Sequence, residues 1–453
     1  MTVKSELLSR IEGREARVGV LGLGYVGLPV ATAFGEAGFP VLGFDVDEGI
    51  VECVGRGQSH IGDVSADRVA ALTSVGRLET TTDFDRLTEV EAIIICVPTP
   101  LSKTGDPDVS YIVKATEDVR RHLRPGQLVI LESTTYPGTT RELLQARLEE
   151  AEFAFGEDVF LAFSPERVDP GNPQYELKNT PKVVAGLTPA CHKLAVALYR
   201  QVIDTVVEVS SPEAAELTKI LENTFRAVNI GLVNEMAVIA DRLGIDIWEV
   251  VDAAATKPYG FMRFTPGPGL GGHCIPIDPQ YLAWKMRTLH YKTRFIEMAA
   301  EVNASMPRYV VSKIAEALNE DRKPVNGSRI LLLGVSYKAD VEDTRESPAL
   351  DILGLLQGMG ARLRYHDPYV PSVQLEWDRI DSVPLTAEEL AAADAVVITT
   401  DHRVVDYQRV LDHAAIVVDP RNALRGRTGP ATVYPIAGPP YRKEAATRSG
   451  APV

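Results

Sequence analysis

RVGVLGLGYVGLP, residues 17–29, joins a short apolar run to three glycines in the spacing GxGxxG. The run RVGVL is rich in β-branched residues and predicts a buried strand, and helical spacing of apolar residues follows through Ala37. Between the two, Gly22 permits a tight turn, Gly24 lets a pyrophosphate approach the backbone, and Gly27 allows the helix to pack closely on the strand. The stretch therefore predicts the first β-turn-α unit of a dinucleotide-binding fold.

The surroundings of this turn favour NAD as the cofactor. A helix N-terminus attracts phosphate through its unpaired N–H groups and the positive end of its dipole. Asp45 ends the next predicted strand, where its carboxylate can accept hydrogen bonds from the adenosine ribose, and the acidic residues after it disfavour the extra phosphate of NADP. The expected cofactor contacts are Gly22, Gly24, Tyr25, Val26, Gly27 and Asp45. A glycine turn in an α/β fold that binds no nucleotide is the alternative.

Short apolar runs alternate with helical spacing at both ends of the chain, which predicts parallel, doubly wound sheets. The middle of the chain, residues 212–255 and 279–319, shows helical spacing without strand signals. We therefore expect an α/β protein with two Rossmann-like doubly wound domains joined by a central helical region, and a partly loose tail from Ala437. The expected strands are residues 17–21, 40–47, 92–98, 127–133, 159–166, 205–210, 329–336, 362–368, 395–401 and 415–422, and the expected domains are 1–210, 211–322 and 323–453.

Bulk properties exclude several classes of function. A chain of 453 residues exceeds one compact core, and its net charge of -15 argues against nucleic-acid or anionic-membrane partners. The N-terminus has no apolar signal core and no window resembles a membrane span, so we expect a cytoplasmic protein. The four cysteines match no zinc or disulfide spacing, and no metal is expected. In a reducing compartment a free thiol can serve as a nucleophile.

A second unusual stretch is PGPGLGGHCIPIDP, residues 266–279, in which four glycines disfavour both helix and strand just before Cys274. In another segment, Lys219 and Asn223 are four residues apart on one helical face, where they could activate and orient a hydroxyl group. Polar residues at predicted strand ends, among them Glu166, would border the same cleft. Thr99, Ser133 and Thr134 occupy such ends and suit ribose or nicotinamide contacts, although ordinary turn and cap roles are an equal alternative for each.

Six motifs in order across the chain carry a family resemblance: GLGYVGLP, STTYPGTT, SPERVDPGN, ELTKILENTFRAVNI, PGPGLGGHCIPIDP and GVSYKADVEDTRESPAL. Together they resemble the UDP-glucose/GDP-mannose 6-dehydrogenase family, NAD-dependent enzymes that oxidise the C6 alcohol of a nucleotide sugar to a carboxylate. The resemblance implies an N-terminal NAD domain, a central dimerisation region, a C-terminal nucleotide-sugar domain, and a homodimer or larger homo-oligomer.

The resemblance also implies catalytic roles. Cys274 corresponds to the nucleophile that forms a thiohemiacetal and then a thioester. Lys219 and Asn223 correspond to the residues that orient the reacting oxygen, and Asp278 to a residue that works with Lys219 on a water or a proton. Glu166 corresponds to the carboxylate of thioester hydrolysis. Thr134 matches a residue that holds the catalytic water. Which of Lys219, Asp278 and Glu166 takes each proton stays open.

Binding roles follow in the same way. Arg345 corresponds to an arginine that reaches toward NAD, and Arg421 to one that contacts the neighbouring subunit's sugar nucleotide. The loop glycines would let backbone N–H groups close on the sugar and phosphates, with His273 as a loop contact and the other cysteines in the core. The expected substrate contacts are Glu166, Arg167, Lys219, Asn223, Gly271, Tyr337, Lys338 and Arg421.

The substrate is expected to be a UDP-N-acetylhexosamine, with UDP-N-acetyl-D-glucosamine first and UDP-N-acetylmannosamine or UDP-glucose as alternatives. Two departures disfavour UDP-glucose: Ile277 stands where that branch typically has lysine, and Pro170 where it has a second glutamate. Arg263 receives no transferred role. A one-step β-hydroxyacid-type dehydrogenase and a non-catalytic NAD-binding protein are more remote readings.

Overall fold

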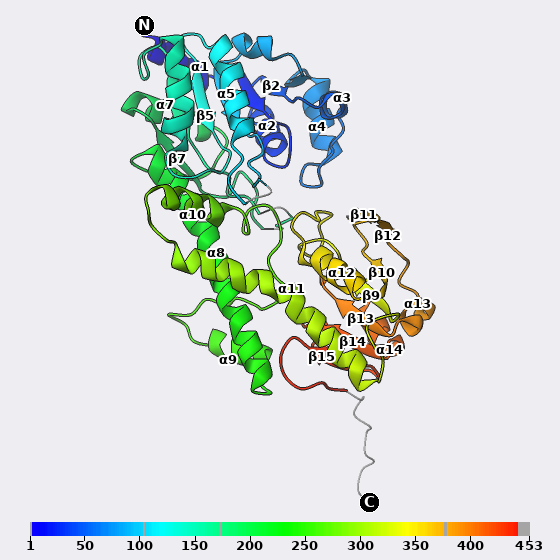
Figure 1. Ribbon diagram of the computed structural model, residues 1–453. Helices are drawn as coiled ribbons and strands as arrows, with labels where there is room; N and C mark the ends of the chain where they lie inside the picture. The colour runs from blue at the N-terminus through cyan, green and yellow to red at the C-terminus, as the bar shows by residue number, and fades with distance from the viewer. Residues whose placement is uncertain (1, 103–104, 170, 173, 376–377, 443–453) are drawn as a thin grey trace, which may run out of the picture. The chain divides into compact units, whose positions relative to one another are not determined.

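The computed structural model describes residues 2–102, 105–169, 171–172, 174–375 and 378–442. It divides into two compact units (Figure 1). The first comprises residues 1–223 and 277–292, and the second comprises residues 224–276 and 293–453. The three domains expected from the sequence stay a prediction, because they are continuous segments of the chain, whereas each of these two units combines separate segments.

The first unit is built on an eight-stranded sheet. Its first six strands have the order of a dinucleotide-binding fold, with the reversal of strand order between β1 and β4. All neighbours are parallel except β6 and β7, which pair antiparallel. In spatial order the strands are β3 (Leu78–Thr81), β2 (Val41–Phe44), β1 (Val18–Leu21), β4 (Ala92–Ile95), β5 (Leu128–Leu131), β6 (Phe160–Phe163), β7 (Lys182–Gly186) and β8 (Val206–Glu208).

The predicted strands of this sheet are confirmed, and two more are present. β3 escaped prediction because only its first residue is buried, so it lacks an apolar pattern. β7 is entirely buried but spans five residues and ends in alanine and glycine, which weakens its strand signal. Its antiparallel direction departs from the all-parallel expectation.

Helices cover both faces of the first sheet, which makes it doubly wound (Figure 1). One face packs against α1 (Val3–Glu12), α2 (Gly27–Glu36), α3 (Glu48–Gly55), α4 (Ala66–Ser74) and α7 (Pro189–Tyr199). The other packs against η1 (Phe84–Glu89), α5 (Ser110–His122), η2 (Thr140–Gln145) and α6 (Ala146–Leu148), and the short turn η3 (Glu149–Ala151) follows.

The second unit has its own parallel five-stranded sheet, again with apolar cores on both faces. Its order is β10 (Arg362–His366), β9 (Arg329–Leu333), β13 (Ala395–Ile398), β14 (Ile416–Asp419) and β15 (Thr432–Pro435). Helices α11 (Arg294–Glu320) and α12 (Pro348–Gly358) cover one face, and α13 (Ala387–Ala392) and α14 (Tyr407–His413) cover the other. Strands β11 (Ser372–Gln374) and β12 (Arg379–Asp381) form a separate antiparallel pair.

The end of the described chain corrects one expectation. The loose tail predicted from Ala437 is wrong for its first residues, because Ala437 is fully buried and Tyr441 exchanges backbone hydrogen bonds with Val433 of β15. The rest of that predicted tail, residues 443–453, lies outside the described residues.

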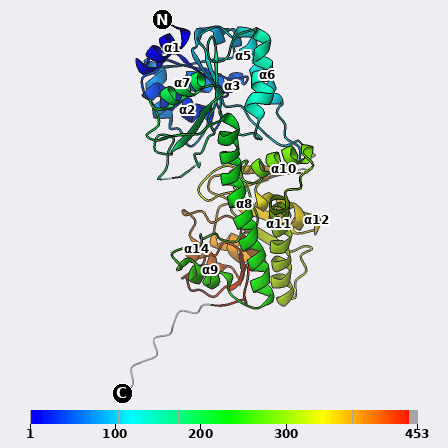
Figure 2. The same ribbon diagram turned by 90° about the vertical axis from the view of Figure 1, so that its left-hand side faces the viewer.

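The predicted helical region consists of α8 (Pro212–Arg242), α9 (Ile247–Ala255), α10 (Asp278–Thr288) and α11. From Thr224 onward α8 packs its apolar side against α9 and α11 (Figure 2). The helical spacing of residues 279–319 corresponds to two helices, α10 and α11, and between them His290 adopts a left-handed φ of 56°. Within the ranges that the structure covers, no helix combines the length and the apolar character needed to span a bilayer.

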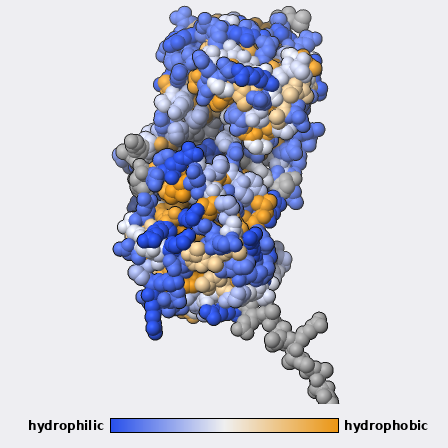
Figure 3. All heavy atoms as spheres, turned by 90° about the vertical axis from the view of Figure 1, so that its right-hand side faces the viewer, coloured by the Kyte–Doolittle hydropathy of each residue, from blue (hydrophilic) through white to orange (hydrophobic). Residues whose placement is uncertain are grey.

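The outer side of α8 is unusual. On the face drawn in Figure 3, hydrophobic residues form small groups within a mostly hydrophilic surface. Along α8, in contrast, large apolar side chains recur at helical spacing and are more than a third exposed: Leu217, Leu221, Phe225, Leu232, Met236 and Ile239, with Leu243 directly after the helix. A row of this kind is typical of an interaction surface.

Candidate active site

The glycine turn after β1 has the shape that a dinucleotide requires. Gly22 has a φ of +87°, and a Cβ there would lie 2.9 Å from the carbonyl oxygen of Cys96. At Gly24 a Cβ would meet no atom within 4 Å, so the backbone is open where a pyrophosphate would approach. The N–H of Leu23 donates to Oδ2 of Asp45 at 2.8 Å, which fixes the turn to the end of β2. These residues fit NAD at the start of α2.

Neighbouring strand ends supply polar groups at the same edge of the sheet. The Ser133 hydroxyl donates to the carbonyl oxygen of Val97 at 2.7 Å, which ties the ends of β4 and β5 together. Thr99 and Thr134 are half-buried at those ends. Because ligands of such folds bind beyond the carboxyl ends of the strands, these groups lie where the sequence predicted cofactor contacts.

Three predicted catalytic residues come together in the first unit. Lys219 and Asn223 lie one turn apart on α8, Asp278 opens α10, and all three are more than nine-tenths buried. The Asn223 side-chain amide donates to Oδ2 of Asp278 at 2.5 Å. Burial raises the pKa of Asp278 to about 6, although Lys219 and the Asn223 hydrogen bond act to lower it. The cluster therefore presents a cation, an amide and a carboxylate that is mostly ionised at neutral pH.

Glu166, just after β6, belongs to a buried network that the sequence did not reveal. Nζ of Lys182 lies 3.1 Å from Oε2 of Glu166 and 3.2 Å from Oε1 of Glu132. Burial alone would raise the pKa of Glu166, but the Lys182 ammonium and, further along, Lys219 hold it below its usual value. Lys219 thus acts electrostatically on both predicted carboxylates, Glu166 and Asp278.

Arg167, predicted to contact substrate, turns toward α8. Its Nη2 atom lies 2.6 Å from Oε1 of Glu222, and Nη1 donates to the carbonyl oxygen of Pro181 at 2.5 Å. Its role toward substrate stays a prediction. Pro170, used above to distinguish the sugar branches, lies outside the described residues.

In the second unit, the glycine-rich loop is fixed at both ends. The N–H of Gly267 donates to Oδ1 of Asn234 at 3.0 Å, and the N–H of Gly272 donates to the carbonyl oxygen of Arg345 at 3.0 Å. A Cβ at Gly271 would lie 2.5 Å from Cβ of Tyr337, and one at Gly272 would lie 2.8 Å from its ring. Glycine is required at these two positions because the Tyr337 side chain packs directly on the loop, a reason that the sequence alone did not supply.

Two buried asparagines that sequence analysis missed support this loop. Asn234 of α8 donates to Oδ1 of Asn303 on α11 at 2.9 Å, and Asn303 donates to the carbonyl oxygen of Ala227 at 3.1 Å. Both side chains are more than nine-tenths buried. The sequence did offer one signal for them, because each asparagine stands among apolar residues on the inner side of a long helix. A buried amide is costly without a hydrogen-bond partner, so two such residues predict a buried pair.

Cys274 follows the glycine-rich loop and is half-buried, with its Sγ atom 3.6 Å from both ring nitrogens of His273. It belongs to the second unit, whereas Lys219, Asn223 and Asp278 belong to the first. That Cys274 meets them in the working enzyme stays a prediction. All four cysteines are free thiols: Cys96 and Cys191 are buried as expected, and Cys53 is half-buried.

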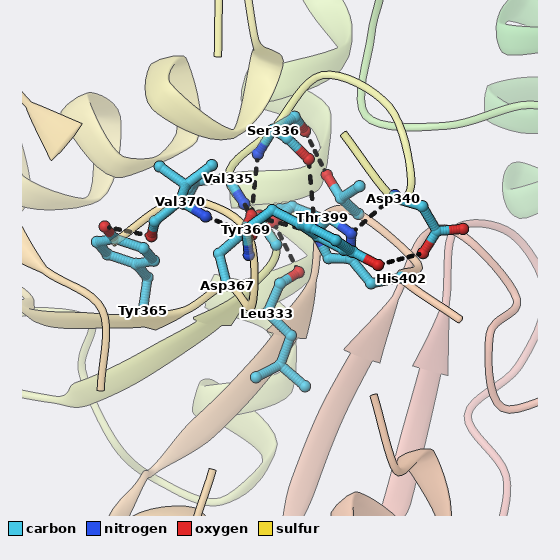
Figure 4. Close-up of polar contacts among 12 residues, drawn as sticks. Leu333, Val335, Ser336, Asp340, Tyr365, Asp367, Tyr369, Val370, Thr399 and His402 are labelled. Carbon is cyan, nitrogen blue, oxygen red and sulfur yellow. Dashed lines mark hydrogen bonds and ion pairs between the residues drawn. The ribbon is translucent and has the colours of Figure 1, made fainter. Parts of the chain in front are cut away.

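The carboxyl edge of the second sheet is organised around Asp367 (Figure 4). Its carboxylate accepts hydrogen bonds from the N–H groups of Val335 and Ser336 and lies 3.1 Å from Nε2 of His402. The N–H of Asp340 donates to Nδ1 of His402, so Nε2 carries the proton and donates to Asp367. Burial would raise the pKa of Asp367, but His402 and the backbone N–H groups hold it below its usual value.

This arrangement fixes the loop that follows β9, which carries the predicted substrate contacts Tyr337 and Lys338. The loop lies at the point where the strand order reverses, between β9 and β13, the usual ligand site of such sheets. Sequence analysis did not single out Asp367 or His402. Asp367 falls within the predicted strand 362–368, of which the structure ends β10 at His366, and His402 directly follows the predicted strand 395–401.

The two predicted arginines make contacts within the second unit. The Arg345 guanidinium lies on Asp343 of its own loop, with Nη2 and Oδ2 2.6 Å apart. Nε of Arg421 donates to the carbonyl oxygen of Thr399 at 2.9 Å, and its Nη1 atom lies 2.9 Å from the position that a Cβ of Gly267 would take. Their roles toward NAD and a neighbouring subunit stay predictions.

Comparisons with known proteins identify the family. Three models of the UDP-glucose/GDP-mannose dehydrogenase family match: the NAD binding domain over residues 16–203, the central domain over 213–305 and the UDP binding domain over 331–426.

Curated relatives cover most of the chain. A UDP-N-acetyl-D-glucosamine 6-dehydrogenase of Pseudomonas aeruginosa is 36% identical over 86% of this chain and 91% of its own length. A UDP-N-acetyl-D-mannosamine dehydrogenase of Pyrococcus horikoshii is 35% identical over 90% of this chain and 96% of its own length.

Solved structures agree with these matches. The structure of the UDP-D-ManNAc dehydrogenase of Pyrococcus horikoshii superposes with a TM-score of 0.85 at 33% identity and covers 93% of this chain and 99% of its own. A UDP-glucose dehydrogenase of Pyrobaculum islandicum gives a TM-score of 0.82 at 28% identity, covering 94% and 98%. The chain belongs to the UDP-glucose/GDP-mannose dehydrogenase family and is an oxidoreductase with an NAD-binding domain and a UDP-binding domain.

Proposed function

We propose that the protein oxidises the C6 hydroxyl of a UDP-N-acetylhexosamine, in the first place UDP-N-acetyl-D-glucosamine, to the uronic acid used in surface polysaccharides. The observation that carries this proposal is the buried cluster of Lys219, Asn223 and Asp278, which has the groups needed to hold and deprotonate an alcohol. Relatives named for the gluco and manno sugars match at 36% and 35% identity, so UDP-N-acetylmannosamine is the second candidate.

Each part of this chain has a task in the reaction. The Gly22–Gly27 turn and Asp45 would hold NAD, which when bound would supply the hydride acceptor for each of the two oxidations, so that two molecules would be used per sugar. The Lys219 ammonium and the Asn223 amide hold the reacting oxygen, and Lys219 stabilises the negative charge that develops on it. Asp278, whose pKa is raised by burial to about 6, is available as a carboxylate beside them.

The Cys274 thiolate prevents escape of the aldehyde. Its sulfur forms a bond to C6 of the aldehyde to give a thiohemiacetal, and the second oxidation of that carbon leaves a thioester. A water held by Thr134 then attacks the acyl carbon: a C–O bond forms, the C–S bond breaks with its electron pair on sulfur, and the water's proton passes to Glu166. One alcohol, two NAD and one water thus give one carboxylate, two NADH and three protons.

The UDP group is assigned to the carboxyl edge of the second sheet. Tyr337 and Lys338 lie on the loop fixed by Asp367 and His402, and Arg421 follows the next strand, β14. Lysine and arginine bind diphosphates through charge-assisted hydrogen bonds. The exposed apolar row on α8 supports a homodimer formed through that helix.

The test is a panel of UDP-sugars incubated with the protein and NAD, with NADH yield and product mass as readouts. Two NADH per sugar and a uronate mass support the proposal, whereas one NADH per sugar would indicate a one-step dehydrogenase. Stabilisation by ligands without turnover would indicate a binding protein.

Variants test the thiol assignment. Cys274→Ala is expected to abolish acid formation while NAD binding persists, and Cys53→Ala, which removes another half-buried free thiol, should leave the reaction intact. Normal uronate production by the first variant would remove Cys274 from the mechanism.

A further inference from the structure

The reversed strand β7 brings a lysine to the edge of the first sheet where Glu166 lies. Because β7 runs antiparallel to β6, its first residue, Lys182, stands beside the end of β6. The side chain is 3% exposed, with Nζ 3.1 Å from Glu166 and 3.2 Å from Glu132. Glu132 follows β5, so residues from three adjacent strands converge on this one ammonium group.

Two carboxyl groups thus share one buried cation, and their surroundings differ. Glu166 accepts hydrogen bonds from the backbone N–H groups of Arg167 and Val168, and the positive charge of Lys219 also acts to lower its pKa. Glu132 accepts the Tyr199 hydroxyl and lies 3.9 Å from the Cys96 thiol. The charged and titratable side chains around these two carboxyls are those of Lys182, Lys219, Tyr199 and Cys96.

These surroundings shift the pKa values of the two carboxyl groups in opposite directions. Burial raises the pKa of Glu132, and the neighbouring Glu166 adds to this effect. The pKa of Glu166 is lowered, since Lys182, the Val168 N–H and Lys219 together outweigh its burial. When only one of the two carboxyls is ionised in this network, the negative charge therefore belongs to Glu166. Such a division of roles between paired carboxyls is typical of acid-base sites.

We propose that Lys182 is a positioning residue that holds Glu166 as an oriented carboxylate for thioester hydrolysis, while Glu132 completes the buried network as the second acceptor of Lys182. The inference rests on the proposed function, because it requires Glu166 to take the proton of the attacking water. In that step oxygen bonds to the acyl carbon, the C–S electron pair returns to Cys274, and the proton moves to Glu166.

Two substitutions in the same network have opposite expected effects. Lys182→Met removes the cation, so Glu166 should gain a proton at higher pH, and the acidic limb of the hydrolysis rate should move up by about 1 to 3 pH units. At a pH on that limb the rate should fall roughly 10- to 1,000-fold. Glu132→Gln leaves Lys182 to Glu166 alone, so the limb should move to lower pH. A purely structural network would lower activity in both variants without shifting the limb in opposite directions.

The experiment follows hydrolysis by two readouts. Steady-state rates with the UDP-sugar identified by the panel are measured from pH 5 to 9, and intact-protein mass at each pH reports acyl-enzyme on Cys274. Lys182→Met should accumulate that adduct at a pH where the wild type does not. Lys182→Met alone leaves both Glu132 and Glu166 without their cation and could unfold the protein. The double variant Lys182→Met/Glu132→Gln also replaces the Glu132 carboxyl with a neutral amide, and its acidic limb should show the same upward shift.

A third readout needs no turnover. Infrared difference spectra of the ligand-free protein, with Glu166→Gln to identify the band, report ionisation of Glu166 directly. The band should titrate at higher pH in Lys182→Met than in the wild type. An unchanged titration in Lys182→Met and in the double variant overturns the inference even if the wild type is fully active. A wild type without uronate production overturns the proposed function instead, whatever the infrared titration gives.

Discussion

Asn234→Ala is expected to destabilise the second unit and to loosen the loop that carries Cys274. The substitution removes the acceptor of the Gly267 N–H at 3.0 Å and the donor to Asn303 Oδ1 at 2.9 Å. Both partners are buried, and each polar group left unpaired costs about 1–3 kcal/mol. Allowing for some relaxation, the free energy of unfolding of this unit should fall by roughly 2–5 kcal/mol.

Thermal unfolding gives the direct measurement. For a unit of this size each kcal/mol lowers the midpoint by about 2–4 °C, so the transition of the second unit should fall by roughly 4–20 °C. The matched control is Asn229→Ala on the same helix, a half-buried residue whose amide donates to the Phe225 carbonyl oxygen of its own helix. That variant should change stability by less than about 0.5 kcal/mol.

A second assay reports on the loop itself. Iodoacetamide should alkylate Cys274 faster in Asn234→Ala than in the wild type, because the loop has lost its anchor at Gly267. If Asn234→Ala unfolds at the wild-type temperature and its thiol reacts at the wild-type rate, the amide pair does not hold the loop and the reasoning fails.

Three further outcomes are expected. Gly272→Ala should weaken UDP binding measured by calorimetry, because its Cβ would displace the aromatic ring packed on the loop; Gly76→Ala has a similar positive φ in open space and should leave binding unchanged. Asp278→Asn should abolish activity yet stabilise the protein at pH 8 by about 3 kcal/mol in denaturant unfolding. Because burial raises the pKa of Asp278 to about 6, folding favours its protonated form, and the wild type loses this stability as pH rises from about 4 through about 6. The difference in unfolding free energy between Asp278→Asn and the wild type should therefore grow over that pH window. A constant difference would contradict the raised pKa of Asp278. Leu221→Glu, on the apolar row of α8, should yield monomers in sedimentation, whereas Val75→Glu, equally exposed elsewhere, should not.

Much of the fold could be predicted because its strands are continuous apolar runs. The buried β1, β4 and β5 stand out from polar surroundings, and the glycine turn fixed the position of the first. Local pattern could not reveal β3, which is mostly solvent-facing, or the direction of β7, which depends on tertiary pairing. The long helices were equally clear from their spacing, but the break near His290 depends on a left-handed φ at a non-glycine residue, which the local pattern of apolar residues does not indicate.

The candidate site divides in the same way. Asn223 was predicted from its helical spacing with Lys219 and from the resemblance, and Asp278 from the resemblance. The structure adds a hydrogen bond between them and a burial that no spacing could give. Lys182 carried no signal, since its importance arises only from two carboxyls that are distant in sequence. For Gly272 the predicted reason was ligand approach, whereas the structure gives contact with Tyr337.

The reversal at β7 has a consequence for how this enzyme can diversify. The connection between β6 and β7 contains the SPERVDPGN motif, yet the place of Lys182 is set by strand register, Ala162 opposite Gly186 and Phe163 opposite Ala185, and not by the length of that connection. Insertions and deletions in this connection can therefore accumulate during evolution while the lysine keeps its place. The charge that we propose for hydrolysis is thus independent of the surface that the connection presents.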